Sequence, residues 1–229
     1  MNELNLLGAS KHYEATAKLM EVAMPKLLEY AHVLNECFRE WELTFRLHPT
    51  SVSPKARYRD ENDLRGHKLV LQLGEAVGLA AALDRRLPRD IHDLLLRAEA
   101  MGLEARVIFQ NLLGALPPGM YITTRLITYM PGRHPAQRLH LDSGVATLIH
   151  RPAHDDRLVI DGHNEAPSLD HPSVLAITGE DCHKISKGLT PTWHSVKPLT
   201  QLRPRHVITH FLWDGHADEG ATSIAMHAA

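Results

Sequence analysis

Three side chains in the second half of the sequence have the types and spacing of a metal site. His140 and Asp142 stand two positions apart, and His194 follows much further along the chain. In an extended strand, side chains at i and i+2 lie on the same face, so this imidazole and this carboxylate can bind one ion together. With His194 as third ligand, two histidines and one carboxylate would hold one face of Fe(II) and leave the opposite positions open.

The histidine-x-aspartate pair alone is a weak signal, because the sequence contains 17 histidines. Further landmarks surround it in a fixed order, namely Tyr129-Met130-Pro131, Thr147-Leu148, Gly179-Glu180-Asp181, Arg205 and Phe211. Together with the triad, these landmarks resemble the Fe(II)/2-oxoglutarate-dependent oxygenases over about residues 125–213. Val207 stands where many members have serine, and the segment between Tyr129 and His140 is short, which indicates a compact, divergent member.

The resemblance implies a double-stranded β-helix, or jelly roll, that uses Fe(II), 2-oxoglutarate and O2. His140, Asp142 and His194 would bind the metal. In the family, an arginine on a late core strand binds the far carboxylate of 2-oxoglutarate, and Arg205 takes that place here, with Arg203 as the alternative. A guanidinium suits this role because it is planar, permanently charged and able to bind both carboxylate oxygens.

Tyr129 is expected to give the same carboxylate a hydrogen bond. The implied reaction is hydroxylation, desaturation or ring closure of a substrate, with release of succinate and CO2. Two alternatives keep the same triad: a cupin-like metalloenzyme that works without 2-oxoglutarate, and a non-catalytic sensor of a metal or ligand. Arg205 separates the oxygenase from the cupin-like enzyme, because only the oxygenase needs a deep cation to hold a dicarboxylate.

Several other polar residues have less specific patterns. Arg125 could face a substrate, but a structural pair with Asp181 is the preferred interpretation. His210 could line the pocket or lie on the outer face of its strand. A second metal site is conceivable in one polar cluster, although a solvated turn is the expected role of its members, His150, His154, Asp155 and Asp156.

The elements that must position these residues change character at Pro117-Pro118-Gly119. Before this point, apolar residues recur at helical spacing, with a kink expected at Pro25. The expected helices cover residues 13–43, 63–86 and 89–115, and the polar segment 48–61 is expected to be a loop, able to close over a site.

Beyond the boundary, short segments rich in β-branched residues predict strands. These strands are expected at 121–130, 137–142, 145–151, 157–161, 173–178, 182–186, 191–197 and 205–213. The sequence therefore predicts one α+β domain over residues 1–229. A mainly helical region, 1–116, would pack on a jelly-roll core, 117–215, which is followed by a tail, 216–229.

Composition and charge limit the functions to expect. The formal net charge of −2 gives no basic surface for nucleic acid. Two cysteines make a disulfide framework unexpected, and we expect no signal peptide and find no apolar run of the roughly 20 residues that a membrane span needs. We therefore expect a cytoplasmic enzyme of biosynthesis whose substrate is a small molecule, such as an amino acid or a specialised-metabolite intermediate.

Overall fold

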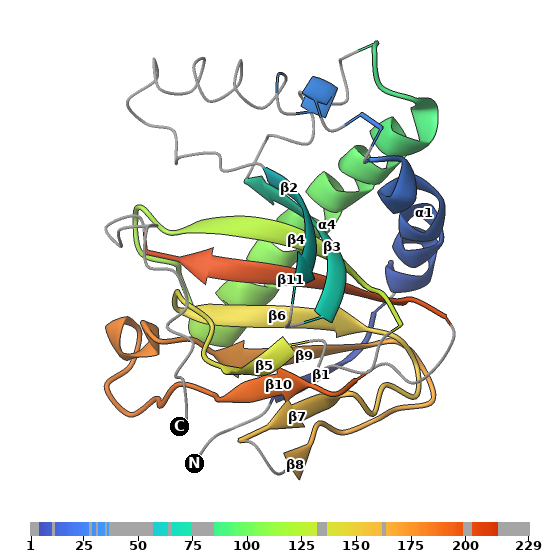
Figure 1. The fold of residues 1–229 in the computed structure, drawn as a ribbon. Coiled ribbons are helices and arrows are strands. Elements are labelled where there is room, and N and C mark those ends of the chain that lie inside the picture. Colours follow the sequence, from blue (N-terminus) through green and yellow to red (C-terminus); the bar gives the residue numbers. More distant parts are fainter. Residues whose placement is uncertain are drawn as a thin grey trace.

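The computed structural model places two antiparallel sheets and two long helices around the predicted site (Figure 1). It describes residues 5–10, 12–27, 29–30, 32–34, 36, 57–63, 66–74, 85–131, 137–161, 164–198 and 203–214. The predicted combination of helices with antiparallel sheets is confirmed. No helix in these ranges is long and apolar enough to cross a lipid bilayer.

The larger sheet has seven strands and carries the late core strand of the prediction near its centre. Its strands, in spatial order, are β1 (Asn5–Ala9), β9 (Ser173–Thr178), β6 (Ala146–Arg151), β11 (Arg205–Trp213), β4 (Tyr121–Tyr129), β3 (Gly66–Gly74) and β2 (Arg57–Asp63). In the register of β11, Arg205 lies opposite Tyr129 of β4, and Phe211 lies opposite Thr147 of β6.

The smaller sheet has four strands and carries two of the predicted metal ligands. Its strands, in spatial order, are β5 (Gln137–His140), β10 (His194–Val196), β7 (Leu158–Ile160) and β8 (Asn164–Glu165). One buried cluster joins the two sheets: it contains Ile127 and Val207 of the larger sheet together with Ile160 and Val196 of the smaller. Alternation along β11 therefore turns Arg205, Val207, Thr209 and Phe211 toward the space between the sheets.

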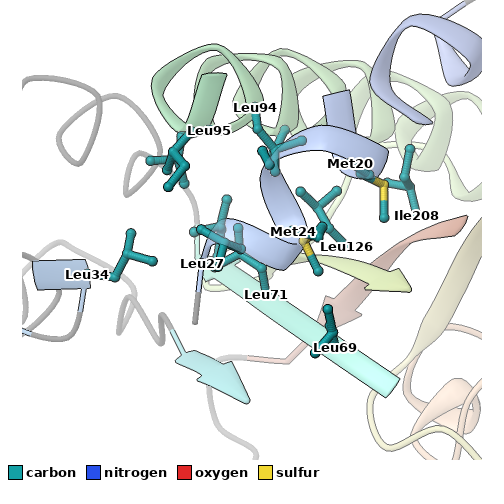
Figure 2. Packing of buried hydrophobic residues seen from close by; sticks show 14 of the residues in the cluster. Met20, Met24, Leu27, Leu34, Leu69, Leu71, Leu94, Leu95, Leu126 and Ile208 are labelled. Carbon is teal, nitrogen blue, oxygen red and sulfur yellow. The ribbon is translucent and has the colours of Figure 1, made fainter. Parts of the chain in front are cut away.

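The opposite, outer face of the larger sheet is covered by helices α1 (Tyr13–Lys26) and α4 (Arg89–Leu113) (Figure 1). Figure 2 shows this packing: side chains of both helices meet Leu71 of β3, Leu126 of β4 and Ile208 of β11. The helical contribution comes from Met20, Met24, Leu94 and Leu95, which are fully buried. Each such side chain contributes about 1.5–3 kcal/mol through burial, and together they hold the larger sheet, which carries Arg205 and Tyr129.

Most of the strands after residue 117 are confirmed, as is the helix predicted at 89–115, which covers 89–113. The helix predicted at 63–86 is wrong over its first part, because β2 ends at Asp63 and β3 covers Gly66–Gly74; residues 75–84 of this prediction lie outside the described ranges. Val70 faces the space between the sheets while Leu69 and Leu71 face the helices. A strand buried on both faces reads as a continuous apolar run, which periodicity does not separate from a helix.

Two other segments differ from the prediction. Residues 182–184 form a 3-10 helix and not a strand. The expected loop at 48–61 contains the start of β2 from Arg57 onward, and its residues 48–56 lie outside the described ranges. Of the helix predicted at 13–43, α1 is confirmed and includes Pro25 in its last turn, whereas most of the remainder lies outside the described ranges.

Candidate metal centre

The structure brings the three predicted ligands together where two neighbouring strands of the smaller sheet, β5 and β10, have adjacent ends. His140 ends β5 and lies directly opposite His194, which begins β10, and their ring centroids are 4.2 Å apart. Asp142 follows β5 and its carboxylate reaches both rings: its Oδ1 is 3.5 Å from His140 Nε2, and its Oδ2 is 3.6 Å from His194 Nε2. One ligand atom from each residue lies within 4.8 Å of the others, which is close enough for one metal ion.

Backbone contacts orient both imidazole rings. His140 Nδ1 lies 2.9 Å from the carbonyl oxygen of Arg138, and His194 Nδ1 lies 3.2 Å from that of Thr192. A carbonyl oxygen only accepts hydrogen bonds, so in the neutral ring the proton sits on Nδ1. The lone pair of Nε2 is then directed toward Asp142, as a metal-binding histidine requires.

The position of Asp142 is fixed by a hydroxyl and by two backbone segments. Thr147 Oγ1 donates a 2.7 Å hydrogen bond to Asp142 Oδ2, and the backbone N–H of Glu180 donates to the Asp142 carbonyl at 2.9 Å. Gly144, at φ +102°, turns the chain from Asp142 into β6, and its carbonyl accepts from the N–H of Asp181 at 2.8 Å. Thr147 and the Glu180-Asp181 segment, which are landmarks of the sequence, thus hold the turn that carries Asp142 in place.

The charges of the triad suit a divalent cation. Burial alone would raise the pKa of Asp142, but contacts with His194, His140 and Thr147 hold this pKa well below its ordinary value. Burial lowers the pKa of His194. The carboxylate is therefore ionised and the buried imidazole is neutral near pH 7, which are the protonation states that metal ligands need.

Arg205 and Tyr129 lie together on the inner face of the larger sheet, with the Arg205 Cζ 5.3 Å from the tyrosine ring centroid. Arg205 donates from Nε to Asp155 Oδ1 at 2.9 Å and from Nη2 to Oδ2 at 2.6 Å. Burial would lower the pKa of Arg205, but Asp155 holds it above its usual value. Arg203 is exposed. Of the two predicted anchors, only Arg205 is thus placed between the sheets.

The solvated turn expected for the cluster around Asp155 is wrong for two of its members. Asp155 is buried against Arg205, and His150 is buried on the outer face of β6. His210 also lies on the outer face, where its ring is 5.0 Å from that of His150, so it does not line the metal centre. Among the described residues, only the His140 triad groups three ligands closely enough for a metal ion.

Arg125 lies on the inner face and not in the expected pair with Asp181, whose carboxylate binds Lys184 at 3.3 Å. Its Nε donates to Gln72 Oε1 at 2.8 Å, and its Cζ lies 4.3 Å from the Phe211 ring centroid. Sequence reasoning did not foresee these contacts, because Gln72 belongs to the strand that was predicted as a helix.

Known proteins resemble this chain in structure but not in sequence. The sequence matches no model of a protein family and no curated protein. The structure matches dioxygenase for auxin oxidation 1 from Arabidopsis thaliana, solved in a 2-oxoglutarate binary complex, with a TM-score of 0.55 and 16% identity over 91% of both chains. It matches the dioxygenase for auxin oxidation from rice with a TM-score of 0.53 and 17% identity, over 90% of this chain and 80% of the other.

A third match is a full-length protein from Neurospora crassa, solved in complex with alpha-KG. The TM-score is 0.52 at 12% identity, over 81% of this chain and 73% of the other. At such identities, the likeness establishes a shared fold. The resemblance predicted from the sequence is therefore confirmed at this level: the chain has the fold of the two auxin dioxygenases and a histidine–aspartate–histidine group within it.

Proposed function

We propose that the protein is a non-haem oxygenase that depends on Fe(II) and 2-oxoglutarate and has a jelly-roll core. The observation that carries this proposal is the convergence of His140, Asp142 and His194, whose ligand atoms lie within 4.8 Å. Two imidazoles and one carboxylate on one face fit Fe(II), and bound iron would supply the activation of O2. The shared fold with a dioxygenase solved with 2-oxoglutarate supports the choice of co-substrate.

The inner face of β11 offers polar groups that fit a dicarboxylate. Arg205 Nη1 and Thr209 Oγ1 are buried and have no hydrogen-bond partner among the described residues. Further along the same face, Phe211 lies opposite Thr147, which binds Asp142. Arg205 would bind the far carboxylate of 2-oxoglutarate, with Tyr129 beside it, and the metal would bind the 2-oxo acid end.

The protein itself would bind, orient and exclude water. The apolar cluster between the sheets includes Val207, which lies on the inner face of β11 between Arg205 and Thr209. It would exclude water from a ligand bound at that face and so strengthen charge–charge contacts there. The proposed reaction is hydroxylation, desaturation or cyclisation of a small molecule, with release of succinate and CO2. A net charge of −2 supports a small-molecule substrate over nucleic acid, and an amino acid or biosynthetic intermediate in the cytoplasm is the substrate class we propose.

One observation favours a second candidate, a cupin-like metalloenzyme that works without 2-oxoglutarate. The Asp155 carboxylate already uses two nitrogens of Arg205. If this pair neutralises the arginine fully, no cation is left for a second carboxylate. The two candidates share the metal and differ in the co-substrate, so a direct test of 2-oxoglutarate binding separates them.

That test is an anaerobic titration of the protein with Fe(II) and then 2-oxoglutarate, followed through the weak visible charge-transfer band of the chelate. We expect the band in the wild type and in Arg203→Ala, the matched control at an exposed position. In Arg205→Ala, we expect at least tenfold weaker 2-oxoglutarate binding, because hydrogen bonds to charged groups are strong. Iron binding without any 2-oxoglutarate band would contradict the proposal and favour the second candidate.

A further inference from the structure

Arg205 belongs to a buried cluster of charged side chains that, within the described part of the chain, has one positive charge in excess. The side chains of Arg205 and Asp155 are 5% and 2% exposed, and Arg151 is fully buried beside them. The Asp155 carboxylate binds the guanidinium of Arg205, and its backbone carbonyl accepts from that of Arg151, so among the described residues of this cluster two guanidinium groups are accompanied by one carboxylate. A buried charge without a counter-ion is costly, so one further anion would stabilise this cluster.

The two guanidinium groups differ in the nitrogen atoms that are already bound. Arg151 donates from Nε to Ser173 Oγ at 3.2 Å, from Nη1 to the Asp155 carbonyl at 3.4 Å, and from Nη2 to the Pro167 carbonyl. Arg205 uses Nε and Nη2 for Asp155, whereas its Nη1 has no partner among the described residues. Within the described part of the chain, Arg205 Nη1 is therefore the one guanidinium nitrogen of this pair that has no partner.

We propose that Asp155 is a positioning residue, which holds Arg205 by its Nε–Nη2 edge and leaves Nη1 to bind the far carboxylate of 2-oxoglutarate. This inference rests on the proposed function. Asp155 is itself held, because Arg151 binds its carbonyl and the backbone N–H of Arg157 donates to its Oδ1 at 3.4 Å. A fixed carboxylate removes rotational freedom from the long arginine side chain, so less freedom is lost when the ligand binds.

The arrangement makes a specific prediction about ligand choice. 2-Oxopentanoate has the same 2-oxo acid end as 2-oxoglutarate but a methyl group in place of the far carboxylate. Asp155 should therefore matter for 2-oxoglutarate and not for 2-oxopentanoate. A general structural role would affect both ligands, and a carboxylate that merely competes for Arg205 would give tighter 2-oxoglutarate binding when its charge is removed.

The test measures dissociation constants of both ligands from the anaerobic Fe(II)-loaded protein through the charge-transfer band. Wild type, Asp155→Asn and Asp156→Asn are compared, because Asp156 is the neighbouring residue, has a 57% exposed side chain and pairs only peripherally, with Arg157. We expect wild type to prefer 2-oxoglutarate. In Asp155→Asn, the dissociation constant of 2-oxoglutarate should rise about tenfold or more, while that of 2-oxopentanoate stays unchanged. Asp156→Asn should leave both values unchanged.

Asp155→Glu is a second variant that keeps the charge balance if Asp155→Asn does not fold, and it should show the same selective loss. Unchanged or tighter 2-oxoglutarate binding in either folded variant would overturn the inference, as would equal weakening of both ligands. Equal affinity of wild type for both ligands would overturn it while leaving a 2-oxo acid site in place. A wild-type protein that binds Fe(II) but gives no band with either ligand would instead show that the proposed function itself is wrong.

Discussion

Gly179 lies against the backbone of Asp142, so closely that a Cβ at position 179 would be 2.9 Å from the Asp142 carbonyl oxygen. The same Cβ would collide with the carbonyl oxygen of Gly144. Both obstacles are backbone atoms of the turn that presents the candidate metal ligand. The end of β9 and this turn can therefore approach each other only because residue 179 has no side chain.

Gly179→Ala should destabilise the protein by about 2 kcal/mol, because overpacking against backbone forces the turn to move. Fe(II) binding should weaken with it, since Asp142 is part of the turn. Urea unfolding measures the stability, and Gly188→Ala is the matched control, because a Cβ there meets nothing within 4 Å. Equal stability of the two variants would show that the contact is not limiting.

Thr147→Val should weaken Fe(II) binding roughly 10–100-fold, the usual effect of losing a partner that orients a metal ligand. The substitution keeps the volume of the side chain and removes the 2.7 Å hydrogen bond to Asp142. Thr147→Ser keeps the hydroxyl and should retain most of the affinity. Competition with a chelator of known Fe(II) affinity measures both variants, and equal affinities for them would contradict a role of the hydroxyl.

Thr209→Val should stabilise the ligand-free protein by about 1 kcal/mol, because a buried hydroxyl without a partner among the described residues is replaced by a methyl group of similar size. Thr123→Val is the contrasting variant: its hydroxyl accepts a 2.8 Å hydrogen bond from Trp213, so its loss should destabilise. Thermal unfolding compares the two. If Thr209 contacts the co-substrate, its variant should also bind 2-oxoglutarate several-fold more weakly. A destabilised Thr209→Val would contradict this account.

Acid should destabilise the protein through His150 and His210, which lie between the larger sheet and the helices. Burial lowers the pKa of His150 to about 4, with a further contribution from His12, and burial lowers that of His210 well below its usual value. Both rings are thus neutral when folded, whereas the unfolded chain takes up protons below about pH 6.5. The contribution of these two histidines to the free energy of unfolding is therefore fully present above pH 6.5 and is lost as the pH falls toward 4.

For His150 alone, the loss between pH 7 and pH 5 is about 2 kcal/mol. Urea unfolding at pH 7, 6 and 5 measures it. The His150→Asn variant should lose this part of the pH dependence, and His183→Asn, at an exposed position, should retain it. The same slope in wild type and His150→Asn would show that His150 is not the group responsible.

The sequence predicted the grouping of His140, Asp142 and His194 through the family resemblance, and local patterns predicted most of the strands around them. β11 and α4 have clear periods and lie where the sequence predicts them. His140 and Asp142 come together as predicted, although β5 ends at His140 and Asp142 lies in the turn after it and not in the predicted strand. The pair between Arg205 and Asp155 was not foreseen, because a loop and a strand 50 residues apart meet through the fold and leave no local signal. Alternation along a strand divides its side chains between two faces but does not say which face meets the helices. The sequence therefore did not place His150 and His210 on the outer face of the larger sheet.

The most direct test of the central claim is the number of Fe(II) ions bound per chain after anaerobic loading and removal of free metal. We expect about one ion in the wild type and in His183→Ala, whose exposed histidine lies outside the triad. His194→Ala and Asp142→Ala should retain almost none. If these two variants bind iron as the wild type does, the histidine–aspartate–histidine group is not the metal centre and the proposed oxygenase function falls with it.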